Sequence, residues 1–587
     1  MKESKQRLAA LRAGIKKQGL DGFIVPRISE YQGEFVAEYA ERLAWLTGFT
    51  GSAGTALVLA DKAAILTDGR YTIQLVQQAD KALYAFENIP ATSVAKWLGE
   101  NAAAGNSIGY DPWLMTAKQI EQIEKMLDGK GIKLATVESN PVDGVWQRRP
   151  AFPAAKAEIF PGNFAGISST DKRKAAAKIL KDKKLGACVI TLPDSLAWLL
   201  NIRGGDVEHT PVVLSFGILH ESGLVEWFVH PEKITPDVKK HIGADVAILH
   251  PDKIAERIRV LTGKVGVDFA RSPVWFKNAL GVAAVDFKDP CIDPKAIKNK
   301  AEQESLRAAH IRDGAALTGF LAWLDDEGPK GKLDELKIVK KLEVFRRKDN
   351  SYRGPSFATI SGWAANGAIV HYRADEKTNA KIKPPGLLLL DSGGQYNDGT
   401  TDITRTLAIG EPTGEMKTRF TLVLQGHIAV AQAKFPQGTN GIKIDALARK
   451  ALQDEGLDYS HGTGHGVGCF LSVHEESASL SPRGTEALKP GMFLSNEPGY
   501  YKEGAYGIRT ESLILVREEG RDEEGQAMLG FETFSLVPID RSLIKKEMLS
   551  ADELKWLNDY HRNVLKIIGP RVDKSVKAWL ERQAAPL

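Results

Sequence analysis

Hydrophobic and polar positions in the first half of the chain repeat in a pattern that predicts two related α/β domains. Each copy opens with a helical segment and a short apolar run, LDGFIVP from Leu20 and LGACVITLP from Leu185. An Ala-Trp-Leu segment and two β-rich runs separated by a turn follow in both copies. We therefore expect domains at residues 1–157 and 158–296, each with a sheet flanked by helices, although unrelated α/β segments share part of this pattern.

The C-terminal half is patterned as pairs of long helices followed by strands, and this order occurs twice. Helical periodicity covers residues 297–326 and 334–348, and again 417–434 and 442–455, and strand-like segments follow each pair. The repeated order predicts a pseudo-symmetric α+β domain within residues 297–587. Its site is expected between the two halves.

Composition and charge narrow the class of protein. The chain has 587 residues, of which 43% are hydrophobic and 26% charged, so several globular domains are expected. Lysine and arginine total 78 against 74 acidic residues, a net charge of +4, and the basic runs are short and scattered. A nucleic-acid partner is therefore not expected.

The three cysteines and the first residues bear on the cellular compartment. The cysteines lie far apart without a CxxC pair, so neither a disulfide framework nor a thiolate zinc site is expected, and a reducing, cytoplasmic location is favoured. The first residues carry charges every few positions and are typical of an amphipathic helix, not of a signal peptide. The longest uncharged window near the start is rich in glycine and threonine, so no membrane partner is expected.

Four carboxylates of the C-terminal half lie at predicted strands or turns. Asp391 follows four leucines, and Asp402 comes after a turn rich in glycine, so two antiparallel strands would bring both together. Glu497 precedes a Pro-Gly turn. Glu511 lies in a β-rich run, where an acidic residue is costly unless it is paired or binds a metal. Taken singly, each of the two aspartates could be a turn or cap residue, and Glu511 could face solvent from an edge strand.

The motif HGTGHGVG, residues 461–468, contains two histidines separated by glycines. Its glycines argue against a helix and favour extended or looped backbone that approaches a ligand closely. It does not fit the dinucleotide fingerprint GxGxxG, and HEESA from His474 does not fit HExxH. Together with the carboxylates, His465 completes a set of four carboxylates and one imidazole. Such a set suits Mn²⁺ or Co²⁺ and predicts a dinuclear hydrolytic site with ions about 3.5 Å apart.

The motifs DSGGQYNDGTTDITRT, HGTGHGVG, EPGYY and GIRTE, with histidines in NGAIVHYR and FLSVHEE, resemble the pita-bread metallopeptidases. The resemblance is strongest to the long, three-domain type of the aminopeptidase P (Xaa-Pro aminopeptidase) family and extends over nearly the whole chain. It implies a mixed α/β and α+β fold. Two creatinase-like domains, residues 1–157 and 158–296, would precede a pita-bread catalytic domain with a C-terminal extension, residues 297–587.

The resemblance also implies the reaction and its residues. In this family a water or hydroxide bridging two divalent metals attacks the peptide and releases the first residue when proline follows it. The metal would be Mn²⁺, with Co²⁺ or Zn²⁺ as alternatives. Asp391 would bind one metal and His465 the other, and Asp402, Glu497 and Glu511 would be shared. Glu497 would also take the proton of the bridging water.

Further roles follow from the same resemblance. His371, His461 and His474 match substrate-binding histidines, with His474 at the scissile carbonyl and His371 near the prolyl side. Tyr501 and Arg509 match positions that organise the ligands and relay protons, and Arg509 is expected on the same strand face as Glu511; ordinary packing and ion pairing is the alternative for both.

Other functions of the same fold stay open. Prolidase, which cleaves only dipeptides, is the nearest alternative, and a metal-free binding module is the next. A homodimer is implied by the family alone.

Overall fold

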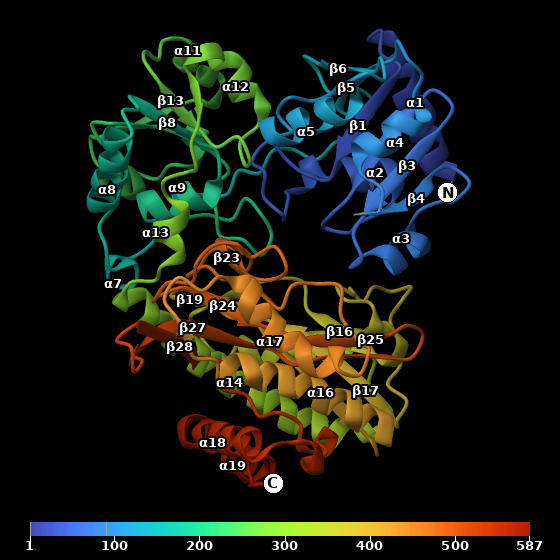
Figure 1. Ribbon diagram of the computed structural model, residues 1–587, viewed down its shortest axis with the longest axis vertical. Coiled ribbons are helices and arrows are strands. Elements are labelled where there is room, and N and C mark those ends of the chain that lie inside the picture. The colour runs from blue at the N-terminus through green and yellow to red at the C-terminus, as the bar shows by residue number, and fades with distance from the viewer. Residues whose placement is uncertain (1, 90) are drawn as a thin grey trace. The chain divides into compact units, whose positions relative to one another are not determined.

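Two six-stranded sheets with the same strand order form the N-terminal unit, Met1–Ile292 (Figure 1). The orders are β4-β3-β2-β1-β5-β6 and β12-β11-β10-β8-β13-β14. The first sheet comprises β1 (Gly22–Pro26), β2 (Thr55–Leu59), β3 (Ala63–Thr67), β4 (Ala85–Asn88), β5 (Ser107–Tyr110) and β6 (Lys133–Thr136). The second comprises β8 (Ala187–Ile190), β10 (Phe216–His220), β11 (Val225–Phe228), β12 (Val246–Leu249), β13 (Val265–Val267) and β14 (Ala284–Asp286).

The two sheets also agree in the direction of every strand pair. The first and second strands of each copy are antiparallel, as are the second and third, and the other neighbours are parallel. The prediction of two related α/β domains is confirmed. The boundaries after residues 157 and 296 stay predictions.

Helices cover both faces of the first sheet because its strand residues alternate in direction. Phe23 and Val25 pack against α1 (Lys2–Lys17) and α2 (Arg42–Thr47), whereas Ile24 packs against α4 (Val94–Asn101) and α5 (Ala117–Leu127). The amphipathic helix predicted at the N-terminus is α1, and Met1 lies outside the residues that this computed structural model describes, 2–89 and 91–587. Further helices of the unit are α3 (Thr72–Gln78), α6 (Pro141–Val145), α8 (Ser169–Asp182), α9 (Pro193–Leu200), α10 (Pro236–Ile242), α11 (Ile254–Arg259) and α12 (Val274–Leu280).

The second unit, Asp293–Leu587, contains the helix pairs predicted from periodicity. They are α14 (Lys300–Glu327), α15 (Glu335–Arg346), α16 (Gly414–Ala431) and α17 (Gly441–Gln453). The first of them begins three residues later than predicted because Asn299 caps it. The Asn299 side chain accepts a hydrogen bond from the backbone N–H of Glu302, and the Glu302 carboxylate accepts one from the backbone N–H of Asn299. The helix, helix, strand order given twice is confirmed.

Strands of the second unit form several sheets that carry the candidate site. A three-stranded sheet has the order β16-β17-β20, and a six-stranded sheet has the order β21-β28-β27-β24-β22-β23. Their strands are β16 (Ile360–Trp363), β17 (Gly386–Ser392), β20 (Ile403–Ile409), β21 (Phe435–Pro436), β22 (Gly464–Gly466), β23 (Glu475–Leu480), β24 (Phe493–Asn496), β27 (Ser512–Arg521) and β28 (Ala527–Thr533). Smaller sheets contain β15 (Tyr352–Pro355), β18 (Gly394–Tyr396) and β19 (Gly399–Thr400), and β25 (Gly499–Lys502) with β26 (Tyr506–Arg509).

The C-terminal helices belong to the core of the second unit. Helices α18 (Ala551–Ile568) and α19 (Lys574–Gln583) pack against α14, and α18 also contacts α16 (Figure 1). Leu557, Val564 and Leu580 are buried in the same apolar cluster as Leu388 of β17. The C-terminal extension is therefore continuous with the core that supports the candidate site.

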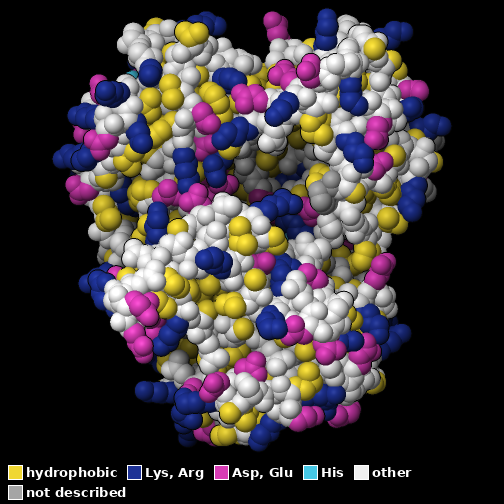
Figure 2. Space-filling view, in the orientation of Figure 1, with side chains coloured by type: hydrophobic (Ala, Val, Ile, Leu, Met, Phe, Trp, Pro, Cys, Tyr) yellow, Lys and Arg dark blue, Asp and Glu magenta, His cyan; other side chains and the backbone are white. Residues whose placement is uncertain are grey.

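The surface is mixed in charge, and the cysteines are buried. On the face shown in Figure 2, Lys and Arg side chains are interspersed with Asp and Glu side chains. Among the described residues, no helix combines the length and the apolar character needed to cross a bilayer. Cys188, Cys291 and Cys469 are buried and free of disulfides.

Candidate metal centre

The hairpin of β17 and β20 brings Asp391 and Asp402 to the same end of one sheet. The two strands are antiparallel, with Asp391 opposite Thr404 and Ser392 opposite Ile403, and Asp402 directly precedes β20. Both aspartates are buried, at 7% and 4% exposure. The predicted pairing of these two strands is confirmed.

His465 and the two glutamates come from the six-stranded sheet. His465 lies in β22, Glu497 directly follows β24, and Glu511 directly precedes β27. The HGTGHGVG segment is extended at residues 464–466, as predicted, and two of its glycines lie close to neighbouring strands. A Cβ on Gly464 would lie 2.0 Å from the carbonyl oxygen of Ser495, and one on Gly466 would lie 2.4 Å from that of Glu475. These glycines therefore permit close packing of neighbouring strands. The expectation that this backbone approaches a ligand stays a prediction.

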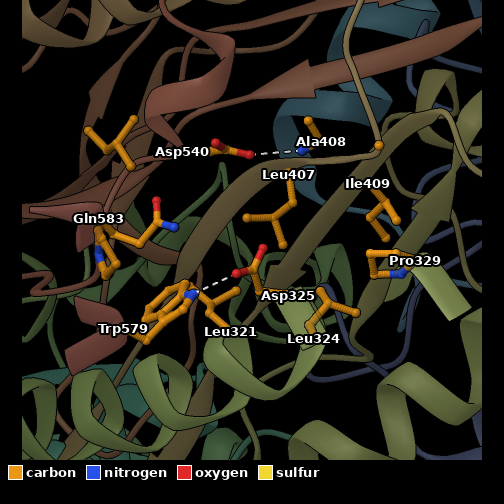
Figure 3. Close-up of a pocket in the computed structure, with 13 residues that line it drawn as sticks. Leu321, Leu324, Asp325, Pro329, Leu407, Ala408, Ile409, Asp540, Trp579 and Gln583 are labelled. Carbon is orange, nitrogen blue, oxygen red and sulfur yellow. Dashed lines mark hydrogen bonds between the residues drawn. The ribbon is translucent and has the colours of Figure 1, made fainter. Parts of the chain in front are cut away.

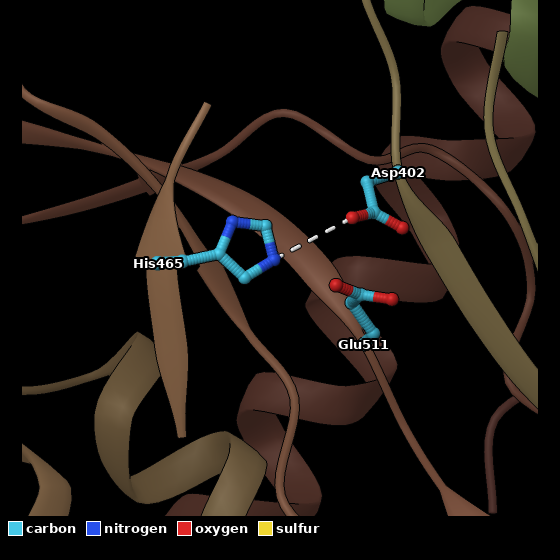
Figure 4. A group of neighbouring side chains, drawn as sticks. All are labelled: Asp402, His465 and Glu511. Atoms are coloured by element: carbon cyan, nitrogen blue, oxygen red, sulfur yellow. Dashed lines mark ion pairs between the residues drawn. The ribbon is translucent and has the colours of Figure 1, made fainter. Parts of the chain in front are cut away.

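Asp402, His465 and Glu511 converge on one space (Figure 4). One potential ligand atom of each lies within 4.8 Å of the others. The His465 Nε2 atom is 3.7 Å from Asp402 Oδ2 and 3.4 Å from Glu497 Oε1. His465 Nδ1 lies 2.9 Å from the carbonyl oxygen of Gly466 and donates to it, so Nε2 carries the lone pair and faces the carboxylates.

Arg509 links Asp391 to the rest of the cluster. Its Nη2 donates to Asp391 Oδ2 at 2.6 Å, and its Nη1 donates to the Tyr501 hydroxyl at 2.7 Å. Arg509 and Glu511 both contact the hydroxyl of Thr404: Arg509 Nε donates to it at 3.2 Å, and it donates to Glu511 Oε2 at 2.8 Å. Arg509 ends β26, whereas Glu511 lies between β26 and β27 and donates its N–H to the carbonyl of Thr404. The two side chains therefore reach the same hydroxyl, although the residues lie outside a common strand.

The electrostatics of the cluster fit a cationic occupant. Burial, and then the nearby Glu511 and Asp391, raise the pKa of Asp402 well above its ordinary value. Burial, followed by Asp391 and Glu497, raises the pKa of Glu511 in the same way. Among the described residues, the buried Oδ1 atoms of Asp391 and Asp402 have no hydrogen-bond partner. Divalent cations would supply the missing partners and relieve the repulsion between carboxylates, and this oxygen-rich donor set suits them.

His474 packs directly against His465. Their rings meet edge to face with centroids 4.2 Å apart. His474 directly precedes β23, the strand that pairs with β22. The structure therefore brings a second imidazole beside the predicted ligand.

His461 reaches the cluster through Tyr501. Its Nδ1 lies 2.8 Å from the carbonyl oxygen of Gly462 and donates to it, which leaves Nε2 to accept from the Tyr501 hydroxyl at 2.8 Å. Burial raises the pKa of Tyr501 to about 12, so its phenol is protonated at neutral pH. A continuous series of hydrogen bonds thus runs from His461 through Tyr501 and Arg509 to Asp391.

His371 is linked to the cluster through the backbone of its neighbour Val370. It follows Val370, whose carbonyl oxygen accepts a hydrogen bond from Arg509 Nη1 at 3.3 Å. The backbone beside His371 is therefore tied to the guanidinium that contacts Asp391. The other predicted site residues all take part in the contacts described above.

The hydroxyls of Thr404 and Ser495 orient the proposed ligands, and neither residue was predicted from the sequence. Thr404 Oγ1 donates to Glu511 Oε2 at 2.8 Å, and Ser495 Oγ accepts from the His465 N–H at 3.0 Å and donates to Glu497 Oε1 at 3.3 Å. Strand alternation was the available signal: Thr404 lies two residues after Asp402, and Ser495 lies two residues before Glu497.

A separate pocket near α19 is not a candidate metal centre (Figure 3). Its volume is about 90 Å³, and its two carboxylates already have donors. Asp325 accepts from Trp579 Nε1 and Asp540 accepts from the Ala408 N–H, both at 2.9 Å. Its other lining residues are Leu321, Leu324, Pro329, Leu407, Ile409, Gly410, Pro538, Ile539 and Gln583, so no histidine lines it within the described chain.

Four family models match the chain. Metallopeptidase family M24 matches residues 304–518, and the C-terminal region of peptidase M24 matches 527–587. The Creatinase/Prolidase N-terminal domain matches residues 7–142, and a second model of that description matches 148–302. The matches follow the order of sheets and helices described above.

Full-length relatives and a solved structure agree with these matches. The "Probable Xaa-Pro aminopeptidase P" of Penicillium rubens is 39% identical over 610 residues, covering 100% of this chain and 99% of the relative. That of Neosartorya fischeri is 40% identical over 608 residues, covering 99% and 92%. The X-prolyl aminopeptidase of Caenorhabditis elegans, described as a cytosolic enzyme with a di-nuclear active site, superposes with a TM-score of 0.96 at 32% identity, covering 100% of both chains. The chain therefore belongs to the aminopeptidase P (Xaa-Pro aminopeptidase) group of metallopeptidase family M24.

Proposed function

We propose that the chain is a metal-dependent aminopeptidase that removes the first residue from peptides with proline in the second position. The observation that carries this proposal is the convergence of Asp402, His465 and Glu511 within 4.8 Å in a fold shared along its full length with an X-prolyl aminopeptidase. A metal-free binding module is disfavoured, because gathering three buried carboxylates and the partly buried Glu497 around one space is costly without cations.

The proposed ligands are Asp391, Asp402, His465, Glu497 and Glu511, which together would hold two divalent ions. Mn²⁺ is the first candidate and Co²⁺ or Zn²⁺ the alternatives, because the set is rich in oxygen and lacks thiolates. When bound, such ions lower the pKa of a water and polarise the scissile carbonyl near neutral pH. Glu497 would act as general base and take the proton of the attacking water. Ser495 holds the Glu497 carboxylate through its hydroxyl.

The proposed substrate contacts come from the three other histidines. His474 would donate a hydrogen bond to the scissile carbonyl as negative charge develops, and its contact with His465 supports this position. His371 would lie near the prolyl side. His461 would exchange protons with Tyr501, and Arg509 would hold Asp391 in place.

Several finer properties are proposed on family grounds. The enzyme would act on peptides in the cytoplasm as a homodimer, without nucleic-acid or membrane partners. The cytosolic Caenorhabditis elegans enzyme supports the location. The domain boundaries would be residues 1–157, 158–296 and 297–587, which the family-model matches at 7–142, 148–302 and 304–518 support approximately.

A peptide panel tests the proposal against its nearest alternative, prolidase. We expect hydrolysis of Xaa-Pro-Xaa tripeptides and longer peptides, and a value of kcat/KM about 100-fold lower when alanine replaces proline, because a site that selects proline would lose its contacts with the ring. Cleavage of Xaa-Pro dipeptides alone would assign the chain to prolidase. Equal cleavage of alanyl and prolyl peptides would indicate a general aminopeptidase.

A further inference from the structure

An ion pair outside the proposed ligand set is buried behind the metal centre. Asp313 lies in α14 and Arg346 ends α15, and both side chains are at most 1% exposed. Arg346 Nε donates to Asp313 Oδ1 at 2.7 Å, and its Nη2 donates to Oδ2 at 3.2 Å. Neither residue belongs to a sequence motif of the site.

This ion pair contacts both arms of the segment that joins Asp391 to Asp402. Arg346 donates to the carbonyl oxygens of the two residues that follow Asp391, to Gly393 at 3.1 Å and to Ser392 at 3.4 Å. Asp313 Oδ2 accepts from the hydroxyl of Thr401, the residue before Asp402, at 2.8 Å. The pair therefore contacts residues directly adjacent in sequence to two proposed metal ligands.

The segment itself has little room to adjust. Thr401 Oγ1 also accepts the N–H of Gly394 at 2.9 Å, which joins the two arms directly. A Cβ on Gly393 would lie 1.9 Å from the Thr401 carbonyl oxygen and 2.1 Å from Ser356 Oγ. Tyr396, between the arms, donates its hydroxyl to Asp313 Oδ1 at 2.8 Å. The Asp313 carboxylate thus accepts hydrogen bonds from Arg346 and from two side chains of this segment.

A stabilising role alone explains this arrangement poorly. Desolvation of two buried charges offsets most of their attraction, so a buried ion pair contributes little net stability compared with apolar side chains of similar size. The ion pair instead fixes the positions of its hydrogen-bond partners, because the planar guanidinium and the carboxylate form hydrogen bonds in set directions.

We propose that Asp313 and Arg346 are positioning residues that set the separation and orientation of Asp391 and Asp402, an inference that rests on the proposed function. Loss of this constraint weakens metal binding without unfolding the chain. The effect reaches the metal through the backbone of the segment 392–401, not through direct contact with either ion.

Thr401 offers an isosteric test of this constraint. T401V removes the hydroxyl that joins Asp313 to Gly394, whereas T401S retains it, and both conserve most of the side-chain volume. D313N removes the charge at the centre of the cluster. The matched control is D206N in the N-terminal unit, where Asp206 pairs with Lys233 at 2.5 Å and both side chains are fully buried.

The readout is Mn²⁺ binding to full-length protein freed of metal with a chelator, measured by isothermal titration calorimetry, with circular dichroism to verify folding. We expect T401V and D313N to bind at least one Mn²⁺ about 10-fold more weakly, and T401S and D206N to stay within about twofold of the wild type. If D313N does not fold, the comparison of T401V with T401S decides the question.

Two results would overturn the inference, and they are distinguishable. Wild-type affinity in both T401V and D313N, or an equal loss in D206N, would reject the positioning role and leave the proposed function intact. A wild-type protein that binds no divalent metal would reject the proposed function and the positioning role together.

Discussion

The guanidinium of Arg405 donates a hydrogen bond to the backbone carbonyl of Glu511 at 2.5 Å. The same side chain donates to the carbonyl of Val537 and to the hydroxyl of Tyr560, both at 2.8 Å. Because Tyr560 lies in α18, one buried cation joins a proposed metal ligand to the C-terminal helices. The C-terminal extension is therefore a structural part of the catalytic unit.

Substitutions of Tyr560 and Arg405 should lower the free energy of unfolding by different amounts. Y560F removes a hydroxyl that also lies 2.7 Å from the Val537 carbonyl, and we expect it to destabilise the second unit by about 1 to 2 kcal/mol. R405K leaves several buried carbonyls without donors and should lower the free energy of unfolding by about 3 kcal/mol. Urea unfolding of the metal-free protein measures both. Equal stability of R405K and the wild type would contradict this role for Arg405.

The histidines should separate into two classes when replaced by alanine. His465→Ala removes a proposed ligand and should lower metal occupancy together with activity. His474→Ala should fold and keep about two ions per chain, with turnover reduced about 100- to 1,000-fold through loss of one donor to the developing oxyanion. Metal content and steady-state kinetics of the two variants check this. Metal lost from His474→Ala but kept by His465→Ala would show that the ligand assignment is wrong.

Acid sensitivity of the second unit should depend in part on His310. Burial lowers the pKa of this histidine from 6.5 to about 4, and its ring packs against Phe493 and Phe534. Between about pH 6.5 and pH 4 the unfolded chain takes up a proton here that the folded chain does not, so stability falls as the pH falls through this window. Above it, His310 contributes no pH dependence.

His310→Leu removes this source of pH dependence. We compare the free energy of unfolding of the variant with that of the wild type. Their difference, variant minus wild type, should be about 2 kcal/mol larger at about pH 5 than at about pH 7.5. Urea unfolding of both proteins at both pH values measures this difference. A change in packing that affects stability equally at both pH values cancels in the comparison. A difference that is the same at both pH values would exclude His310 as a source of acid sensitivity.

Local sequence patterns were sufficient to predict much of the site. The leucines before Asp391 and the glycine-rich turn before Asp402 identified a hairpin, because strand pairing is set by alternation and by the turn. The glycines around His465 identified extended backbone. These features depend on residues close in sequence, whose steric limits act locally.

Contacts between distant elements were not predictable in the same way. Asp313 and Arg346 lie in helices whose periodicity identifies a buried face but does not identify which loop that face meets. Such positions are fixed by tertiary packing.

The proposed two-metal site makes hydrolysis depend on bound divalent ions. The full-length protein should be dialysed against a chelator, its metal content measured by mass spectrometry, and its hydrolysis of an Xaa-Pro-Xaa tripeptide followed before and after addition of Mn²⁺ or Co²⁺. We predict that hydrolysis disappears with the metal and returns as about two ions per chain are restored. Full hydrolysis by protein that contains no bound metal would contradict the account.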